Sequence, residues 1–579
     1  MYQELFNHLA FIYGEVTAVS TTNALVAKLK VFQTTHPEFS AVGSVTGSRV
    51  SEKDIVLITY GDMVQEAGDA PLSTLTKFLE QRVGDVINTV HILPFYPYSS
   101  DDGFSVIDYK AVDPTLGSWS DVAEMSEHFR LMFDAVINHI SAESDWFQEF
   151  LAEKRPFTTY FTIPNPQEDW SQVFRPRALP LFTEFETANG TKQVWTTFSA
   201  DQIDLNYANP NLLLEVLDTL LFYVAQGAEF IRMDAIAFIW KEPGTNCLHL
   251  PQVHHIIQLM RTVLNLVAPQ VAIITETNVP HKDNISYFGD GHNEAQLVYN
   301  FPLPPLTLHA FHAGNAETLS KWAESLTLPS NEVTFFNFLA SHDGIGLMPA
   351  RGILSETAVM QMADRIKDNG GYVSSKNNRD GTQSPYELNI NYLNALADPD
   401  KDEPTELVAQ RFLATQAVML SLRGVPGIYF HSLFGSQNWQ EGVVQTSRNR
   451  TINRQKLNIH KLNNELETEN SLRNLVFNGF QKLLQVRRSQ PAFHPNGRQE
   501  ILHLHDSVFA VMRMDENGRS WILCLHNVSD QTIILNVEFN FLKTAVHTIR
   551  NLLNGKQFPL SENQHVLKMS PYDIIWLTE

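Results

Sequence analysis

Cysteine is scarce in this sequence. A chain of 579 residues contains two, Cys247 and Cys524, far apart from one another. So few cysteines exclude a disulfide framework and a cysteine-built metal site. We therefore predict two reduced thiols that pack in the interior.

Long apolar runs are also lacking. The longest candidate, Leu212–Ile231, is interrupted by Glu215, Asp218 and Glu229, whereas a transmembrane helix needs about 20 consecutive apolar residues. The N-terminus has neither the basic region nor the long apolar region of a secretory signal. We expect a cytoplasmic protein that neither spans nor binds a membrane.

Basic residues are outnumbered, 42 against 64 acidic ones, which gives a net charge of −22. A field of this sign repels nucleic acids and anionic membranes. We therefore expect small-molecule partners, and an anionic substrate would need a local basic pocket. The length predicts two or three domains around a large central one, as a monomer or homodimer.

What the sequence does contain is a repeated pattern of apolar strands that end in carboxylates. The run from Ala228 leads to Asp234, a second run from Ala272 leads to Glu276, and a third from Val333 leads to Asp343. The spacing fits one and then two strand-helix units of a (β/α)8 barrel, an α/β TIM barrel whose chemistry lies at the carboxyl ends of its strands. Arg232, two residues before Asp234, would share its face of the strand.

The remaining barrel strands and the segments between them follow from the same pattern. We predict the other strands at 54–60, 88–95, 131–137, 295–301 and 425–430. Long intervals after strands three and seven predict inserted segments, and period-two alternation near the end predicts a small β domain. The predicted organisation is an N-terminal helical extension at 1–52, a barrel at 53–139, 209–343 and 409–490, an inserted domain at 140–208, a second excursion at 344–408, and a C-terminal β domain at 491–579.

The loop after the second strand, 96–104, combines aromatic rings with carboxylates. Such a combination suits a sugar, whose C–H face stacks on rings while its hydroxyls bind acids. Three acids at one barrel mouth also acquire different pKa values, as cleavage of a glycosidic bond requires. The alternative is a Mg²⁺ site of the enolase type, but these loops lack its lysines. His503 and His505 share a strand face without a third ligand, so we expect no metal and no cofactor.

The motifs Asp134–His139, Phe230–Ile236, Glu276 and Phe338–Asp343 resemble, in order and spacing, the four signature regions of the α-amylase family of glycoside hydrolases. His91–Phe95, Arg175–Arg177 and Arg450–Arg454 further resemble its sucrose-phosphorylase branch. The resemblance implies that Asp234 is the nucleophile, Glu276 the acid/base and Asp343 the group that holds sugar hydroxyls. It implies a glucosyl site formed by Asp102, Phe104, His139, Phe198, Gln202, Arg232, His342 and Arg450.

In that branch phosphate resolves the glucosyl-enzyme, and the resemblance makes Arg177 the phosphate ligand. One element differs from the sucrose phosphorylases: an Asp-Leu-Tyr-Gln element after strand seven is replaced by Ser384, Pro385, Tyr386 and Glu387. Tyr386 is retained, but fructose as leaving group is disfavoured, and the run looks more like the glucosylglycerate phosphorylases. We expect Glu387 to bind acceptor hydroxyls or to pair with a cation such as Arg177 or Lys376.

The predicted function is therefore a retaining glycoside phosphorylase that transfers an α-glucosyl unit to phosphate and releases α-glucose 1-phosphate. Within the branch, sucrose, sucrose 6-phosphate and glucosylglycerol remain alternative donors. A hydrolase or transglucosidase of the same fold is the second hypothesis, because the same carboxylates serve water. The third is a non-catalytic barrel like the amylase-like subunits of amino-acid transporters, which lose catalytic acids that this chain keeps.

Overall fold

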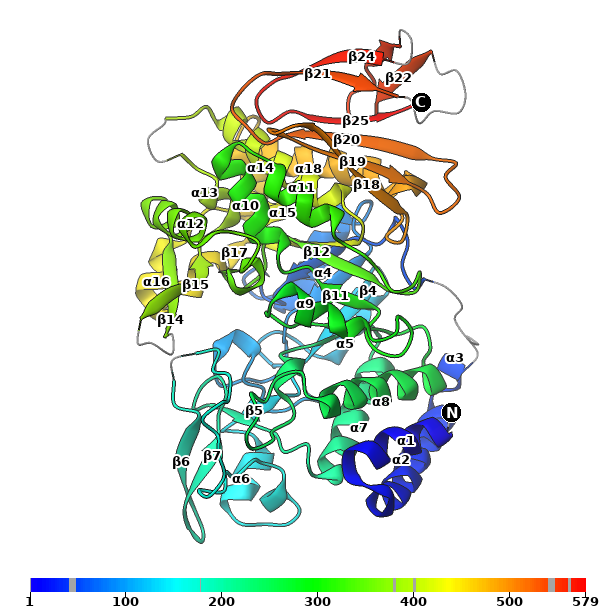
Figure 1. Cartoon of the computed structure of the whole chain (residues 1–579). Helices are drawn as coiled ribbons and strands as arrows, with labels where there is room; N and C mark the ends of the chain where they lie inside the picture. The colour runs from blue at the N-terminus through cyan, green and yellow to red at the C-terminus, as the bar shows by residue number, and fades with distance from the viewer. Residues whose placement is uncertain are drawn as a thin grey trace.

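The computed structural model describes residues 2–40, 48–177, 179–377, 382–398, 402–539, 547–560 and 564–579. Eight parallel strands close into one barrel at its centre, and helices surround them (Figure 1). In sequence order the barrel strands are β1 (Val56–Thr59), β3 (Thr89–Ile92), β4 (Arg130–Ala135), β9 (Ala228–Met233), β10 (Ala272–Thr275), β11 (Leu297–Tyr299), β12 (Thr334–Phe338) and β16 (Val425–Tyr429). The predicted (β/α)8 barrel is confirmed, and each strand overlaps a predicted one.

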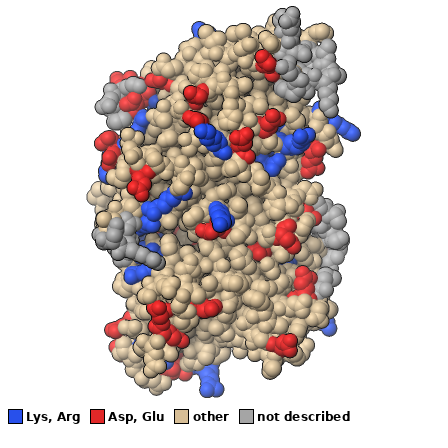
Figure 2. Space-filling model, viewed as in Figure 1, with Lys and Arg blue, Asp and Glu red and all other residues tan. Residues whose placement is uncertain are grey.

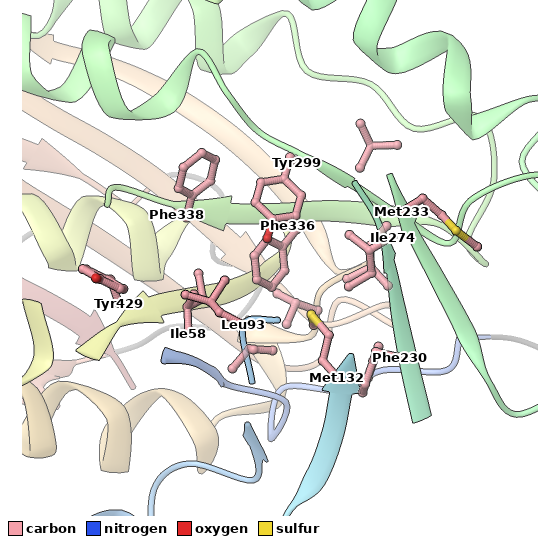
Figure 3. Packing of buried hydrophobic residues seen from close by; sticks show 14 of the residues in the cluster. Ile58, Leu93, Met132, Phe230, Met233, Ile274, Tyr299, Phe336, Phe338 and Tyr429 are labelled. Carbon is pink, nitrogen blue, oxygen red and sulfur yellow. The ribbon is translucent and has the colours of Figure 1, made fainter. Parts of the chain in front are cut away.

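The barrel strands form where they do because their side chains are apolar on both faces. All four residues of β1, β3 and β10 are buried, as expected of parallel strands covered by helices outside and filled by side chains inside. Figure 3 shows this filling, with Met132, Phe230, Ile274 and Phe336 among the labelled side chains that crowd the barrel region. The barrel is a packed core, so chemistry is confined to its mouth.

Helices between the strands cover the barrel. The longest are α4 (Pro71–Val83), α7 (Pro210–Ala225), α8 (Pro251–Val267), α14 (Thr405–Ser421) and α18 (Leu472–Arg488). Shorter ones are α5 (Trp119–Ser126), α10 (Leu303–Ala313) and α11 (Glu317–Glu324). The start of α7 shows why such boundaries follow from sequence: the Asn209 side chain accepts the backbone N–H of Asn211, and Pro210 occupies the first turn, where its missing N–H costs nothing.

The N-terminal segment, predicted as a helical extension, is divided into several helices. It forms α1 (Tyr2–Tyr13), α2 (Glu15–Thr35) and the short α3 (Pro37–Ser40). Gly14 separates the first two at φ 80°, a left-handed conformation that glycine adopts without strain. The chain therefore folds back, and the α1–α2 pair packs on α7 and α8. Residues 41–47 of the predicted N-terminal extension lie outside the described part.

The segment between β4 and β9 carries two small sheets. One pairs β5 (His139–Ser141) with β8 (Gln202–Asp204), and the other pairs β6 (Phe182–Thr187) with β7 (Gly190–Trp195). Between them lies α6 (Asp145–Leu151). In Figure 1 this segment, in cyan, forms the lower left of the molecule beside the barrel.

The segment after β12 is more regular than its polar sequence indicates. It contains α12 (Glu356–Asp368), α13 (Tyr392–Ala395) and a sheet of β13 (Ile345–Gly346), β14 (Tyr372–Asn377) and β15 (Gln383–Asn389) in the order β13-β15-β14. Residues 378–381 and 399–401 of the predicted excursion lie outside the described part.

The C-terminal part is a β sandwich above the barrel in Figure 1. Six strands form its larger sheet: β18 (Arg498–His505), β19 (Val508–Met514), β20 (Trp521–Asn527), β25 (Ile574–Thr578), β22 (Thr548–Asn551) and β23 (Gln557–Pro559). The smaller sheet pairs β21 (Ile533–Glu538) with β24 (Gln564–Met569). A separate cluster of buried apolar side chains lies between them. Across the described residues, no helix has the length and apolar character needed to cross a bilayer.

Candidate active site

A cavity of about 110 Å³ opens at the carboxyl ends of the barrel strands. The predicted acids Asp234, Glu276 and Asp343 all line it, although 109 residues of sequence separate the first from the last (343 − 234). Eight of the other predicted residues share the lining with them: Phe104, His139, Phe198, Gln202, His342, Arg177, Arg450 and Tyr386. Tyr386 completes the wall from β15.

The turn after β9 places Asp234. Its backbone N–H donates to the Ala135 carbonyl at 3.2 Å, which continues the barrel hydrogen bonding by one residue. Ala235 then adopts a left-handed conformation with φ 49°, uncommon for a residue with a side chain. This turn directs the Ala235 N–H to the Glu276 carboxylate, whose Oε2 accepts it at 3.2 Å. Nucleophile and acid/base candidates are thus held by one local structure.

Arg232 lies beneath both acids and connects them. Its Nη1 is 3.0 Å from Asp234 Oδ1, and its Nη2 is 3.9 Å from Glu276 Oε2. The guanidinium is buried and also pairs with Asp134 at the end of β4. Asp134 in turn is 2.7 Å from His91 Nε2 on β3. The guanidinium is therefore fixed in place from below.

Asp134, His91 and Tyr299 belong to the site but not to its predicted members. The Arg232 guanidinium lies 5.5 Å from the centre of the Tyr299 ring. The sequence does carry a signal for Asp134, because it opens the motif Asp134–His139 on which the family resemblance rests. His91 likewise opens the motif His91–Phe95, whereas Tyr299 stands within an apolar strand and carries no such signal.

Burial raises the pKa of the Asp234 carboxyl, against the opposing charge of Arg232, and the neighbouring Glu276 raises it further. Burial likewise raises the pKa of Glu276. Two carboxylates whose charges interact cannot both ionise freely, so the pair tends to hold one proton. Because the guanidinium is nearer to Asp234, the charge is favoured on Asp234 and the proton on Glu276. A charged nucleophile beside a neutral acid is the division that glycosyl transfer requires.

Asp343 is kept ionised instead. Burial opposes its charge, but the guanidinium of Arg450, with Nη1 2.5 Å from Asp343 Oδ1, lowers its pKa well below the usual range. Burial lowers the pKa of His342 to about 3, so this imidazole is neutral. His342 also stacks on Phe104, with ring centres 4.6 Å apart and planes at 7°.

Hydrogen bonds and a ring contact hold the other glucosyl-site candidates. His139 Nε2 and Gln202 Nε2 lie 2.8 and 3.0 Å from the Phe104 carbonyl, and Phe198 lies 5.4 Å from the His139 ring. Burial lowers the pKa of His139. The result is a neutral aromatic wall beside an ionised carboxylate, which suits an uncharged sugar.

Asp102 is placed differently from the expectation. It is 41% exposed and pairs with Arg454, and Asp101 lines the cavity in its stead. Asp101 and Asp102 have positive φ values of 55° and 51°, and this turn directs Asp101 into the cavity, where the family resemblance implies Asp102. Asp101 pairs with Arg177 at 3.2 Å.

Glu387 has a cationic partner other than the two expected. Its Oε1 lies 2.8 Å from Arg450 Nη2 and accepts the Gly344 N–H at 3.0 Å. Glu387 does pair with a cation, as predicted, but the partner is Arg450 and not Arg177 or Lys376. A Cβ at Gly344 would meet Glu387 Cγ at 2.6 Å, so glycine is required for this close approach. Glu387 does not line the inner cavity itself but holds Arg450, which does.

No group of three or more His, Cys, Asp and Glu side chains within the described ranges is arranged to hold a metal ion. His503 is half exposed, with its Nε2 3.4 Å from Glu324 Oε2. Both cysteines are buried and free.

Fold and site together define a (β/α)8 barrel with a carboxylate-lined sugar pocket at its mouth. Residues 83–349 match the family described as alpha amylase, catalytic domain. The chain is 48% identical over 575 residues to a glucosylglycerate phosphorylase from Spirochaeta thermophila, covering 98% of this chain and 97% of that one. It is 30% identical over 464 residues to a sucrose phosphorylase from Bifidobacterium adolescentis, covering 76% and 86%.

A solved structure of sucrose 6F-phosphate phosphorylase from Thermoanaerobacter thermosaccharolyticum aligns with a TM-score of 0.72 at 23% identity, over 89% of this chain and 98% of that one. This likeness concerns the fold. The chain belongs to the α-amylase family, in the branch that contains the glucosylglycerate and sucrose phosphorylases.

Proposed function

We propose that this protein is a glucosylglycerate phosphorylase, which transfers the α-glucosyl unit of glucosylglycerate to phosphate and releases α-glucose 1-phosphate and glycerate. The observation that carries the proposal is one cavity lined by the three acids and, at its outer side, by Arg177. The 48% identical relative of this name supports glycerate as the leaving group, against 30% identity to a relative named for sucrose.

The reaction proceeds by double displacement. The Asp234 carboxylate attacks the anomeric carbon while Glu276 protonates the departing glycosidic oxygen, and a covalent glucosyl ester results. A phosphate oxygen then attacks the same carbon from the side that the leaving group vacated, and Glu276 recovers a proton from the incoming phosphate. Two inversions leave the anomeric configuration unchanged, so the product is the α-anomer.

The other residues bind the glucosyl unit and favour its distortion. The ionised Asp343 accepts hydrogen bonds from sugar hydroxyls, and Arg450 holds that carboxylate in position. Phe104 and Phe198 offer ring faces to the sugar C–H face. His139, His342 and Gln202 add polar contacts, while Asp102 contributes indirectly through Arg454.

The acceptor side is built from Arg177, Tyr386 and Glu387. Because Glu387 is neutralised by Arg450, it does not repel the carboxylate of glycerate. Arg177 is about one-third exposed, and its guanidinium can accept a carboxylate or a phosphate bidentately at different stages of the cycle.

Phosphorolysis of a donor panel tests the proposal. Glucosylglycerate, glucosylglycerol, sucrose and sucrose 6-phosphate are each incubated with and without phosphate, and glucose 1-phosphate and glucose are quantified. We expect glucose 1-phosphate from glucosylglycerate at a kcat/KM at least about 100-fold above the other donors, because a carboxylate contact is worth that much. Free glucose at equal rates with and without phosphate would show a hydrolase instead.

Arg177→Ala should separate phosphorolysis from hydrolysis. We expect glucose 1-phosphate release to fall about 100-fold, the scale of losing a charge-assisted contact, while slow release of glucose continues because water needs no cation. Arg175→Ala is the matched control, since Arg175 lies two residues away and lines a different hollow. Rates of both products that fall together would assign Arg177 a structural role.

We further propose a cytoplasmic location, which two free thiols support because disulfides are uncommon in that compartment. Monomer or homodimer remains a prediction.

A further inference from the structure

A second hollow lies outside the active-site cavity and is continuous with it. This outer chamber, of about 400 Å³, shares Asp101, Pro176, Arg177, Gln202, Tyr386 and Arg450 with the inner cavity. Its remaining wall includes Ser374 and Ser375 of β14 together with Arg448 and Asn449. A substrate that enters through this chamber meets Arg448 in the chamber wall alone, and Arg177 where the chamber joins the inner cavity.

The inner arginines of the chamber are already neutralised. Arg177 pairs with Asp101 at 3.2 Å, and Arg450 with Asp343 and Glu387 at 2.5 and 2.8 Å. Arg454 pairs with Asp102. Arg448 is different, because its side chain is exposed and no carboxylate among the described residues lies within ion-pair distance. Its positive charge is therefore available to an incoming anion.

The backbone presents Arg448 to the chamber in a defined way. Helix α16 (Gln440–Thr446) is followed by Ser447, which has a left-handed φ of 56°. The Arg448 N–H donates to Thr446 Oγ1 at 3.2 Å. The 3-10 helix η6 (Asn449–Asn453) then begins and carries Arg450 into the inner cavity. One short turn thus places one arginine at the sugar site and another at the chamber wall.

The acidic net charge of the chain gives an unpaired cation at this position a function. Its net charge is −22, and Figure 2 shows carboxylates distributed over the visible face. Phosphate, glycerate, glucosylglycerate and glucose 1-phosphate are all anions, so the overall field opposes their approach. A local cation at a chamber mouth with protein walls focuses the field and raises the local anion concentration.

We propose that Arg448, with Asn449, Ser374 and Ser375, forms an outer oxyanion subsite that collects phosphate or carboxylate groups before they reach Arg177. The Ser374 hydroxyl accepts the Asn389 side-chain amide at 2.9 Å, and no acceptor for its own proton lies among the described residues, so it can donate to an oxyanion. This inference rests on the proposed function, because it assumes anionic reactants. It assigns to Arg448 a part in their capture and none in bond cleavage.

Steady-state kinetics across ionic strength test the subsite. For Arg448→Gln we expect kcat/KM for phosphate to fall about 5- to 10-fold at 0.01 M ionic strength, where the Debye length is about 30 Å, and less than about 2-fold at 1 M, where it is about 3 Å. Arg448→Lys should stay close to the parent enzyme. The matched control is Arg519→Gln, which changes net charge equally on the turn between β19 and β20. Hydrolysis of neutral α-glucosyl fluoride should be unchanged in all three.

Calorimetric binding of inorganic phosphate, of glycerate and of neutral glycerol gives a readout independent of turnover. Weaker phosphate binding in Arg448→Gln assigns the subsite to the acceptor, and weaker glycerate binding assigns it to the leaving group. Unchanged affinity for both anions, or an equal loss in Arg519→Gln, overturns the inference. If the parent enzyme fails to phosphorolyse glucosylglycerate, the proposed function fails, and these binding measurements still decide the role of Arg448.

Discussion

Replacement of Asp234 by Asn should abolish turnover while leaving the fold intact. We expect kcat to fall by about four orders of magnitude or more, the scale observed when an enzymatic nucleophile is removed, because an amide cannot form the glucosyl ester. The cavity should keep its shape, since Asn is isosteric with Asp and still accepts a hydrogen bond from Arg232. Release of glucose 1-phosphate from glucosylglycerate is the measurement.

The thermal midpoint of the same variant supplies the control for folding. Burial raises the pKa of Asp234, so the native fold carries a carboxyl whose charge is costly to bury. A neutral side chain at this position should leave the midpoint unchanged or raise it. Mass spectrometry of the denatured parent enzyme, quenched during turnover, should show one added glucosyl unit that the variant lacks. Turnover near the parent rate in Asp234→Asn would refute the mechanism.

The acids could be predicted from sequence because their positions depend on local pattern and fold geometry. Asp234, Glu276 and Asp343 each follow an apolar strand of a parallel barrel, and the ends of such strands meet at one mouth. Fully buried strands such as β1 and β10 give an unambiguous apolar signal. The apolar signal of the strands and the convergence of their carboxyl ends together predict the barrel and the arrangement of its acids.

The contacts at the mouth depend on backbone conformations that such patterns do not reveal. Asp101 and Asp102 both have positive φ, so the choice of the neighbour that faces the cavity is settled by the turn. The Glu387–Arg450 pair joins residues 63 positions apart, and it forms because β15 pairs with β13, which begins two residues after Asp343. Sequence spacing contains no information on that register.

The second large effect is expected from Glu276, the proposed acid that acts beside Asp234. Glu276 holds its proton to a higher pH than a free glutamate, because burial raises its pKa, and the Arg232 guanidinium lies nearer to Asp234 than to Glu276. In the parent enzyme kcat/KM for glucosylglycerate should therefore decline on the alkaline side as Glu276 loses its proton. This alkaline decline of kcat/KM should be absent when Glu276→Ala is assayed with α-glucosyl fluoride.

Glu276→Ala should lose about 1,000-fold in kcat/KM on glucosylglycerate, within the range that general acid catalysis supplies, and far less on α-glucosyl fluoride. Fluoride departs with little protonation, so the first step no longer needs the acid. The second step can be restored by azide, a nucleophile that needs no general base, and the product should be α-glucosyl azide because Asp234 still forms the ester. Proton NMR of the anomeric position measures this configuration. A β-configured azide would mean direct displacement without an Asp234 ester and would give the nucleophile role to Glu276, and equal losses on both donors would contradict its role as the acid.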